Sequence, residues 1–207
     1  MAIRGLIFDF GGVISNMRWD VARELEEQYG LERGAIARTI FASDEWREIE
    51  LGRGDLDAWR AAGHRRLEEL AGRSLPPLHQ QWREASGLID QNVELIGRLR
   101  PPYRIALLSN ADISLPERIR DGLGIGHLFD TVVCSAVEGI AKPEHRIYRL
   151  AAERLHLPVE ECLFVDDAER NVDAAREVGM AAVHYREHRG DDLAAQLAEL
   201  GVRPDSA

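Results

Sequence analysis

Five short apolar runs alternate with segments of helical spacing, and this alternation constrains the fold more than any other feature of the sequence. The runs cover residues 3–8, 104–108, 131–134, 162–165 and 181–185. Helical repeats of apolar residues follow the second to fifth runs, over 115–122, 144–155, 170–178 and 191–200. Strands that alternate with helices in this way predict an α/β fold with a doubly wound parallel sheet.

A helical block separates the first apolar run from the second and does not belong to this alternation. Helical spacing recurs over residues 19–29, 33–41, 56–71 and 78–86, with no convincing strand before about residue 100. We therefore expect a small helical domain to be inserted after the first strand. The expected division is a Rossmann-like core domain made of residues 1–15 and 96–207, and a helical domain at 16–95.

Composition narrows the classes of partner and location. The 207 residues carry a net charge of −10, which disfavours binding to nucleic acid or to anionic membranes. No run approaches the roughly 20 apolar residues of a membrane span, and the N-terminal run is too short for a signal peptide. Cys134 and Cys162 lie in apolar runs, which favours reduced packing thiols and a cytoplasmic protein. A monomer and a homodimer both remain open.

Four tryptophans fall in or beside the helical block. We expect Trp46, Trp59 and Trp82 to pack in the core of the inserted domain. Trp19 lies where the insertion begins, and we expect it either to line a substrate entrance or to pack at that junction.

Polar side chains stand where the predicted strands end or in the loops that follow them. They are three carboxylates, one hydroxyl, one amide and one ammonium group: Asp9, Ser109, Asn110, Lys142, Asp166 and Asp167. In doubly wound sheets, ligands bind outside the carboxyl ends of the strands. We therefore expect these six side chains to meet at one edge of the sheet.

This set of groups fits phosphoryl transfer. Three neighbouring carboxylates repel one another and need a cation, for which Mg²⁺ is the expected ion. Ser109 and Lys142 then serve as groups that bind the phosphate and neutralise its charge. Positioning and charge compensation supply most of the catalysis in such reactions. Asp9 would act as a nucleophile and form an aspartyl phosphate, which water then hydrolyses.

The chain resembles the haloacid dehalogenase (HAD) superfamily at four segments. These are "DFGGV" (Asp9–Val13), "LLSNA" (Leu107–Ala111), "AKPEHRIY" (Ala141–Tyr148) and "FVDDAERNVDAA" (Phe164–Ala175). Their order and spacing match the four motifs of that superfamily, and the resemblance spans residues 3–185. The helical block looks like the helical cap of subfamily I. Within the superfamily, the chain looks most similar to helical-cap phosphatases that resemble sugar-phosphate phosphatases.

The resemblance implies an Mg²⁺-dependent phosphatase that acts on a small phosphorylated metabolite, for example a sugar phosphate. Asp9 is then both the nucleophile and a metal ligand. Ser109 and Asn110 bind the transferring phosphoryl group, and Lys142 bridges the phosphate and Asp9. The glycines Gly11 and Gly12 also let the chain turn tightly and come close to the substrate, as their lack of a side chain allows.

The resemblance also implies the rest of the metal site. The backbone carbonyl of Gly11 is expected to bind Mg²⁺ beside Asp9. Asp166 and Asp167 complete the site, with Asp167 expected in direct contact and Asp166 acting through water, although the sequence leaves this assignment open. Asn171 is expected to brace the acidic loop.

Gly11 departs from the family pattern, which has a second aspartate at this position as general acid and base. Without that aspartate the enzyme lacks general acid–base catalysis at this position, which is typically worth about 10²–10⁴-fold in rate. Leaving groups that depart without protonation would suffer least. A water molecule, a group of the substrate or a side chain of the cap could take over the role.

Two other functions remain open from the sequence. A metal-independent 2-haloacid dehalogenase would use the same aspartate on carbon, but it has no use for the acidic pair at 166 and 167. A catalytically weak binding or regulatory protein would explain Gly11. The substrate is not named by the sequence, because the cap sets specificity in this architecture.

Overall fold

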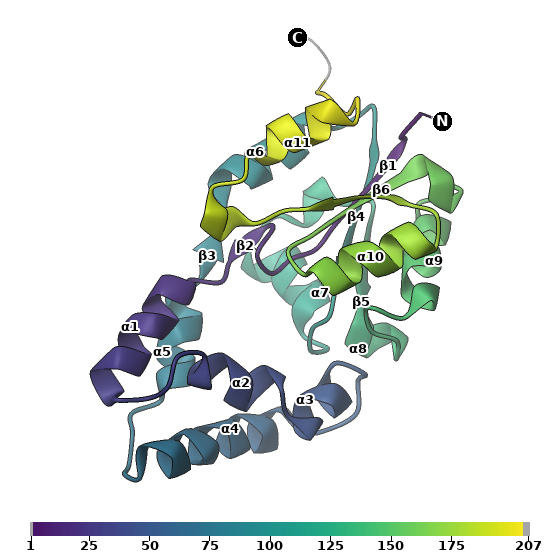
Figure 1. Ribbon diagram of the computed structural model, residues 1–207. Helices are drawn as coiled ribbons and strands as arrows, with labels where there is room; N and C mark the ends of the chain where they lie inside the picture. Colours follow the sequence, from purple (N-terminus) through teal and green to yellow (C-terminus); the bar gives the residue numbers. More distant parts are fainter. Residues whose placement is uncertain (1, 205–207) are drawn as a thin grey trace.

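The computed structural model describes residues 2–204, and a five-stranded sheet lies at its centre (Figure 1). The strand order is β5-β4-β1-β6-β7, and every pairing is parallel. The strands are β1 (Gly5–Phe8), β4 (Arg104–Ser109), β5 (Thr131–Cys134), β6 (Cys162–Asp166) and β7 (Ala181–His184). The predicted α/β fold with a doubly wound sheet is therefore confirmed, and each predicted strand lies within two residues of the observed one.

Helices cover both faces of the sheet, which explains why the apolar runs are continuous. In β1, Leu6 and Phe8 point into one core, and Ile7 points into the other. The helices on the two faces are α6 (Asp90–Arg98), α7 (Leu115–Glu117) and α11 (Leu193–Glu199) on the first, and α9 (His145–Arg154) and α10 (Glu169–Glu177) on the second. A strand buried on both faces needs apolar side chains at successive positions.

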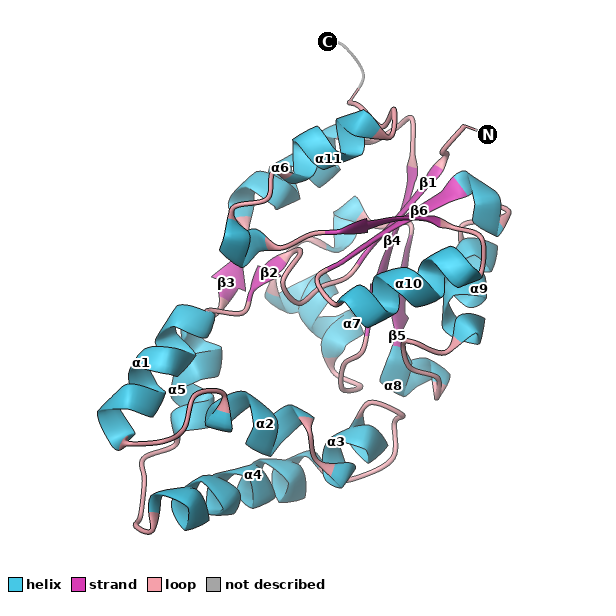
Figure 2. Ribbon diagram, in the orientation of Figure 1, coloured by secondary structure: helices cyan, strands magenta, loops and turns pink. Residues whose placement is uncertain are grey.

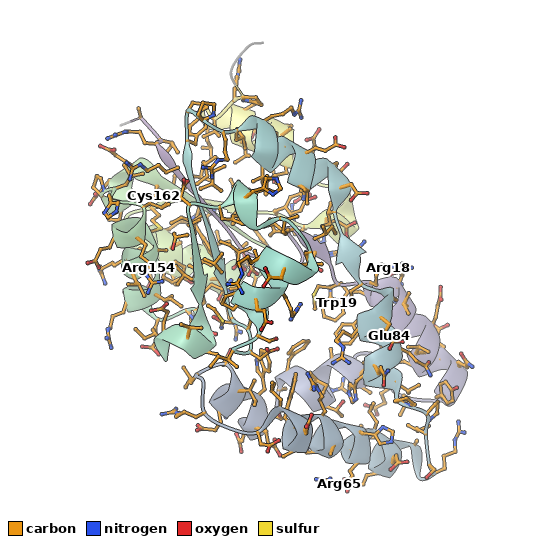
Figure 3. All side chains as sticks on the ribbon, turned by 180° about the vertical axis from the view of Figure 1, so that it is seen from behind. Arg18, Trp19, Arg65, Glu84, Arg154 and Cys162 are labelled. Carbon is orange, nitrogen blue, oxygen red and sulfur yellow. The ribbon has the colours of Figure 1, made fainter. Side chains whose placement is uncertain are left out.

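Five helices form a separate body beside the sheet (Figure 2), and we call this body the cap. They are α1 (Trp19–Tyr29), α2 (Ala35–Phe41), α3 (Asp44–Ile49), α4 (Leu56–Ala71) and α5 (Leu78–Ala85). Trp59 and Trp82 are buried in the cap, and Trp46 packs at 5.0 Å from Trp59. The predicted place of these three tryptophans is confirmed. Arg65 lies on the outer face of α4, away from the sheet (Figure 3).

The junction between cap and core differs from the expectation. Two short strands, β2 (Ser15–Asn16) and β3 (Gly87–Leu88), pair antiparallel where the chain enters and leaves the cap, so the expectation of no strand before residue 100 was wrong. The expected boundary between residues 95 and 96 falls inside α6, whose Leu95 and Ile96 pack against the sheet. We propose that the two domains join at the β2–β3 ribbon.

Short elements complete the core domain. They are a π-helical turn η1 (Arg118–Gly122), the 3₁₀ turns η2 (Gly126–Leu128), η3 (Val159–Glu161) and η4 (Glu187–Arg189), and the helix α8 (Ser135–Glu138). Cys134 and Cys162 are free and buried, as predicted. Among residues 2–204, no helix is long and apolar enough to cross a membrane.

Candidate active site

The strand register brings the predicted site residues to one edge of the sheet. Phe8 of the central strand pairs with Leu107 of β4 on one side and with Val165 of β6 on the other. The residues that follow these three positions therefore emerge together at the carboxyl ends of β1, β4 and β6. They include Asp9 and Ser109, which are 7% and 4% exposed.

A buried lysine joins two of the carboxylates. Lys142 Nζ lies 2.9 Å from Asp9 Oδ1 and 2.6 Å from Asp166 Oδ2, and the side chains of Lys142 and Asp166 are almost fully buried. Burial by itself would lower the pKa of Lys142, but the attraction of Asp166 and Asp9 raises it above its usual range. Lys142 is therefore a fixed positive charge beside Asp9.

Asp9 is held in place by a hydrogen bond, but its negative charge is only partly neutralised by its neighbours. The backbone N–H of Phe10 donates a hydrogen bond of 2.7 Å to Asp9 Oδ1. Burial raises the pKa of Asp9 to about 7, helped by the nearby charges of Asp166 and Asp167 and opposed by Lys142. One lysine thus does not balance the negative charge gathered at this edge.

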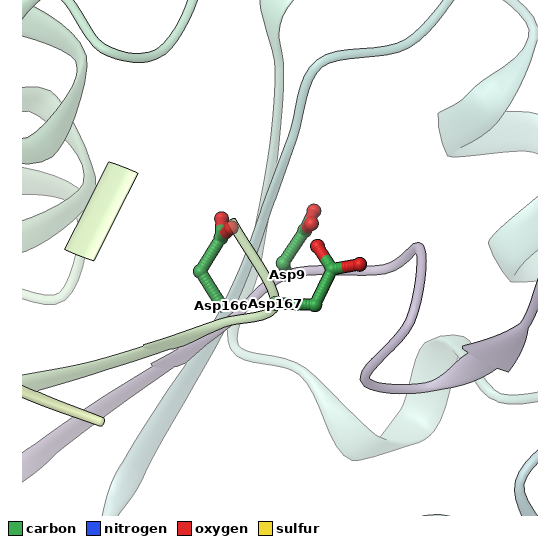
Figure 4. Close-up of side chains that lie close together, drawn as sticks. All are labelled: Asp9, Asp166 and Asp167. Carbon is green, nitrogen blue, oxygen red and sulfur yellow. The ribbon is translucent and has the colours of Figure 1, made fainter. Parts of the chain in front are cut away.

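The two acidic residues after β6 have different surroundings. Asp166 Oδ1 accepts hydrogen bonds from the backbone N–H of Ala168 at 2.8 Å and from Asn171 Nδ2 at 3.0 Å, so Asn171 braces the acidic loop as expected. Asp167 instead turns its carboxylate toward Asp9 (Figure 4). Burial and the charge of Asp166 raise the pKa of Asp167 to about 6.

The three carboxylates fit a hard divalent cation. Asp9, Asp166 and Asp167 each offer an oxygen within 4.8 Å of the others. Carboxylate oxygens are the ligands that Mg²⁺ prefers, and a divalent ion would relieve the repulsion that adds to the effect of burial on the pKa values of Asp9 and Asp167. Asp9 and Asp167 would hold the ion, while Asp166 is already engaged by Lys142 and Asn171.

The two glycines near Asp9, Gly11 and Gly12, differ in whether the structure leaves room for a side chain. Gly12 has φ +72°, and a Cβ there would lie 2.4 Å from Asp167 Oδ2. Gly12 therefore permits the turn and leaves room for Asp167. A Cβ at Gly11 would only meet the flexible Met17 side chain at 3.4 Å, and the φ of Gly11 is ordinary. A Cβ thus fits at Gly11, although none is present.

Asn110 is directed at the backbone of Lys142. Its Oδ1 accepts a hydrogen bond from the Lys142 N–H at 2.8 Å, and its Nδ2 donates to the Lys142 carbonyl at 2.9 Å. The same Nδ2 lies 3.1 Å from Oε2 of Glu50, a cap residue. Asn110 positions Lys142 in this structure, whereas the sequence suggested a contact with the phosphoryl group.

Several residues at the site carried no signal in the sequence. Ser135 Oγ accepts a hydrogen bond from the Ala111 N–H at 3.0 Å and steadies the loop after β4. His184 Nε2 lies 2.9 Å from the Asp167 carbonyl oxygen. Glu50 reaches the site from the cap. Their only sequence signal is a polar residue at the end of an element, which is too common to single them out.

Trp19 packs against the cap and stays partly open. Its ring lies 5.0 Å from that of Trp82, and the residue is 37% exposed. Figure 3 labels it at the start of the cap, near Arg18. Of the two expectations for Trp19, packing at the junction therefore accounts for most of its surface.

Comparison with known proteins gives a consistent result. A family model described as haloacid dehalogenase-like hydrolase matches residues 3–179. D-ribitol-5-phosphate phosphatase from Bacteroides thetaiotaomicron is 27% identical over 96% of this chain and 98% of that protein. Fructose-1-phosphate phosphatase YqaB from Escherichia coli is 30% identical over 88% of this chain and 96% of that protein.

A solved structure shares the fold. It is a HAD family enzyme from Bacteroides thetaiotaomicron, crystallised as the wild-type protein in complex with magnesium and inorganic phosphate. Its TM-score is 0.70 at 21% identity, over 94% of this chain and 99% of that one. The family match covers both the first strand and the acidic loop, so it includes Asp9, Asp166 and Asp167.

Proposed function

The chain belongs to the haloacid dehalogenase-like hydrolases, and from this membership we propose that it is an Mg²⁺-dependent phosphatase that works through an aspartyl phosphate on Asp9. The observation that carries the proposal is the buried Asp9–Lys142 pair beside a second carboxylate, Asp167. A nucleophile, a fixed cation and oxygen ligands for a metal thus share one edge of the sheet.

Each residue has a definite part in the proposed reaction. Asp9 attacks phosphorus, the bond from phosphorus to the substrate oxygen breaks, and water then hydrolyses the aspartyl phosphate. Lys142 neutralises charge on the phosphoryl group and favours the ionised form of Asp9. Ser109, at the end of β4, is the proposed hydroxyl donor to a phosphoryl oxygen. When bound, Mg²⁺ supplies the positive charge that lets two anions approach one another.

The proposed substrate is a small sugar or polyol phosphate. Two named relatives act on D-ribitol 5-phosphate and fructose 1-phosphate, and this chain aligns with nearly the full length of both. Each of those compounds is a phosphate monoester with several hydroxyl groups. We extend that substrate class to this chain, with the cap setting the choice within it.

Hydrolysis of p-nitrophenyl phosphate tests the nucleophile and the metal. The wild type should release phosphate with Mg²⁺ and not with EDTA, and Asp9→Asn should lose the activity, because an amide is a poor nucleophile. Asp121→Asn is the matched control, since Asp121 is exposed and pairs only with its neighbour Arg120. Full activity in Asp9→Asn would refute the assignment of the nucleophile.

The same assay separates the two other functions. A 2-haloacid dehalogenase would release chloride from 2-haloacids without Mg²⁺. A binding protein would take up inorganic phosphate with Mg²⁺ in a calorimeter and hydrolyse no member of an aryl and sugar phosphate panel. The acidic pair at 166 and 167 supports the phosphatase over the dehalogenase, because a metal-free reaction on carbon gains nothing from these charges.

A further inference from the structure

A carboxylate of the cap reaches the edge of the sheet where the reaction is proposed. Glu50 follows α3, is half-buried, and accepts a hydrogen bond of 3.1 Å from Asn110 Nδ2 at its Oε2. Asn110 in turn binds the backbone of Lys142, which contacts Asp9. Three contacts thus link Glu50 to the proposed nucleophile, although Glu50 lies in the cap and outside the four catalytic motifs.

A second contact fixes the loop that carries Glu50. Gly52 packs so closely on α8 that a Cβ would lie 2.1 Å from the Ala136 carbonyl oxygen. Figure 1 shows this loop after α3 as the part of the cap that meets α8. Glu50 is therefore held by its own contact with Asn110 and by the close packing of Gly52, two residues later, on α8.

The surroundings of Glu50 suit proton transfer. The charged groups that face it are Arg170 from α10, Arg47 from α3 and Lys142 from the core. Burial raises the pKa of Glu50 above its ordinary value, while these three cations and Asn110 oppose the rise. A carboxyl group with a raised pKa holds its proton more firmly and can deliver it to a leaving group as a general acid.

The reaction needs such a group in that place. Gly11 has no side chain to protonate the leaving group. In an in-line displacement the leaving oxygen points away from the nucleophile. Asp9 lies at the sheet, so the leaving oxygen faces the cap, and Glu50 is the carboxylate of the cap that contacts the site.

We propose that Glu50 is the general acid and base of this enzyme and takes the place of the aspartate that is missing at Gly11. The inference rests on the proposed phosphatase function. In the first step the Glu50 carboxyl gives its proton to the leaving oxygen as the bond from phosphorus to that oxygen breaks and the bond to Asp9 forms. In the second step Glu50 takes a proton from the water that attacks phosphorus, and Asp9 is released.

Leaving-group dependence tests this role. Glu50→Gln keeps the size and the acceptor for Asn110 but carries no transferable proton. We expect its turnover of alkyl phosphates such as glycerol phosphate to fall about 10²–10⁴-fold further than its turnover of p-nitrophenyl phosphate. The two substrates are compared by kcat/KM, which covers only the steps up to departure of the leaving group and leaves out the later attack of water. In those steps the aryl leaving group departs with little protonation, so it reports on the nucleophile alone. Gly11→Asp combined with Glu50→Gln should restore much of the alkyl turnover, because a Cβ fits at Gly11.

Controls keep the inference apart from the proposed function. Glu48→Gln is the matched variant, since Glu48 lies two residues before Glu50, in the last turn of α3, and pairs at the surface with Arg53. Equal losses on alkyl and aryl substrates in Glu50→Gln would mean a purely positioning role and would overturn the inference, as would no loss on either. A wild type without any phosphatase activity would instead refute the proposed function.

Discussion

At the scale of single residues, both the local backbone and the proposed metal site require that position 12 has no side chain. Its positive φ and its contact with Asp167 both exclude a Cβ. Gly12→Ala should weaken activation by Mg²⁺ by about 10–100-fold, the range seen when groups that orient metal ligands are lost. The measurement is phosphate release as a function of Mg²⁺ concentration.

Gly11→Ala is the matched control for Gly12→Ala. Its Cβ would meet only Met17 Sδ at 3.4 Å, and its backbone conformation suits any residue. It should therefore shift the Mg²⁺ dependence far less than Gly12→Ala does. Equal shifts in the two variants would contradict the view that room for Asp167 is what Gly12 provides.

The sequence could place most single residues of the site but not their contacts. The six polar residues at the strand ends were predictable, because parallel strands present their carboxyl ends at one edge. The engagement of Asn110 with the Lys142 backbone was not predictable, since it depends on how two loops fold back toward each other. Glu50 was out of reach for the same reason, because its partner lies in another domain.

At the scale of elements, the loop after α3 decides how the cap meets the core. Gly52→Ala would add a Cβ at a positive φ and against the Ala136 carbonyl. Strain at such a backbone position is about 1–2 kcal/mol, and the clash adds to it by displacing the loop. We expect lower stability in urea unfolding and a loss of turnover on alkyl phosphates.

Gly72→Ala separates backbone strain from the loss of the contact. Gly72 ends α4 with φ +63°, and a Cβ there meets nothing within 4 Å. It should cost about the same backbone strain and leave turnover near that of the wild type. If Gly72→Ala lowered turnover as much as Gly52→Ala, the contact between the loop and α8 would not be what holds Glu50 in place.

The longest helices were predicted well, while the two-residue strands and one helix, α6, were missed. The helices over 19–29 and 56–71 match α1 and α4, because they have clear apolar faces and, for α4, an Asp55 side chain that caps the first turn. The strands β2 and β3 have two residues each, which is too few for a periodic pattern. The helix α6 was missed, and the domain boundary was placed inside it.

At the scale of the whole molecule, the fold was predictable because local pattern and global topology agree. Each predicted strand after the first is followed by a helix that packs on the sheet, and such connections leave few arrangements. What stayed open is the charge balance of the assembled site, which depends on burial. Three carboxylates and one lysine share a region with little water, so the protein without metal carries unrelieved repulsion.

That repulsion predicts a pH-dependent loss of stability without metal. The pKa of Asp167 rises from 3.8 to about 6 on folding, so the folded chain binds more protons than the unfolded chain in this range. The free energy of unfolding therefore falls as pH rises from about 4 to about 6, by up to about 1.4 kcal/mol per pH unit. Asp167→Asn removes this effect. In EDTA, the variant should exceed the wild type in stability by more at about pH 8 than at about pH 5, with a difference of about 1 kcal/mol.

Urea unfolding with and without Mg²⁺ measures how far the ion offsets the cost of placing these carboxylates together. Mg²⁺ should stabilise the wild type through preferential binding to the folded state, and it should stabilise Asp167→Asn much less. Asp121→Asn, at an exposed surface position, should follow the wild type throughout. A gain in Asp167→Asn that is equal at both pH values would show that Asp167 keeps an ordinary pKa. An equal response of both proteins to Mg²⁺ would remove Asp167 from the metal site and leave Asp9 and Asp166 as its carboxylates.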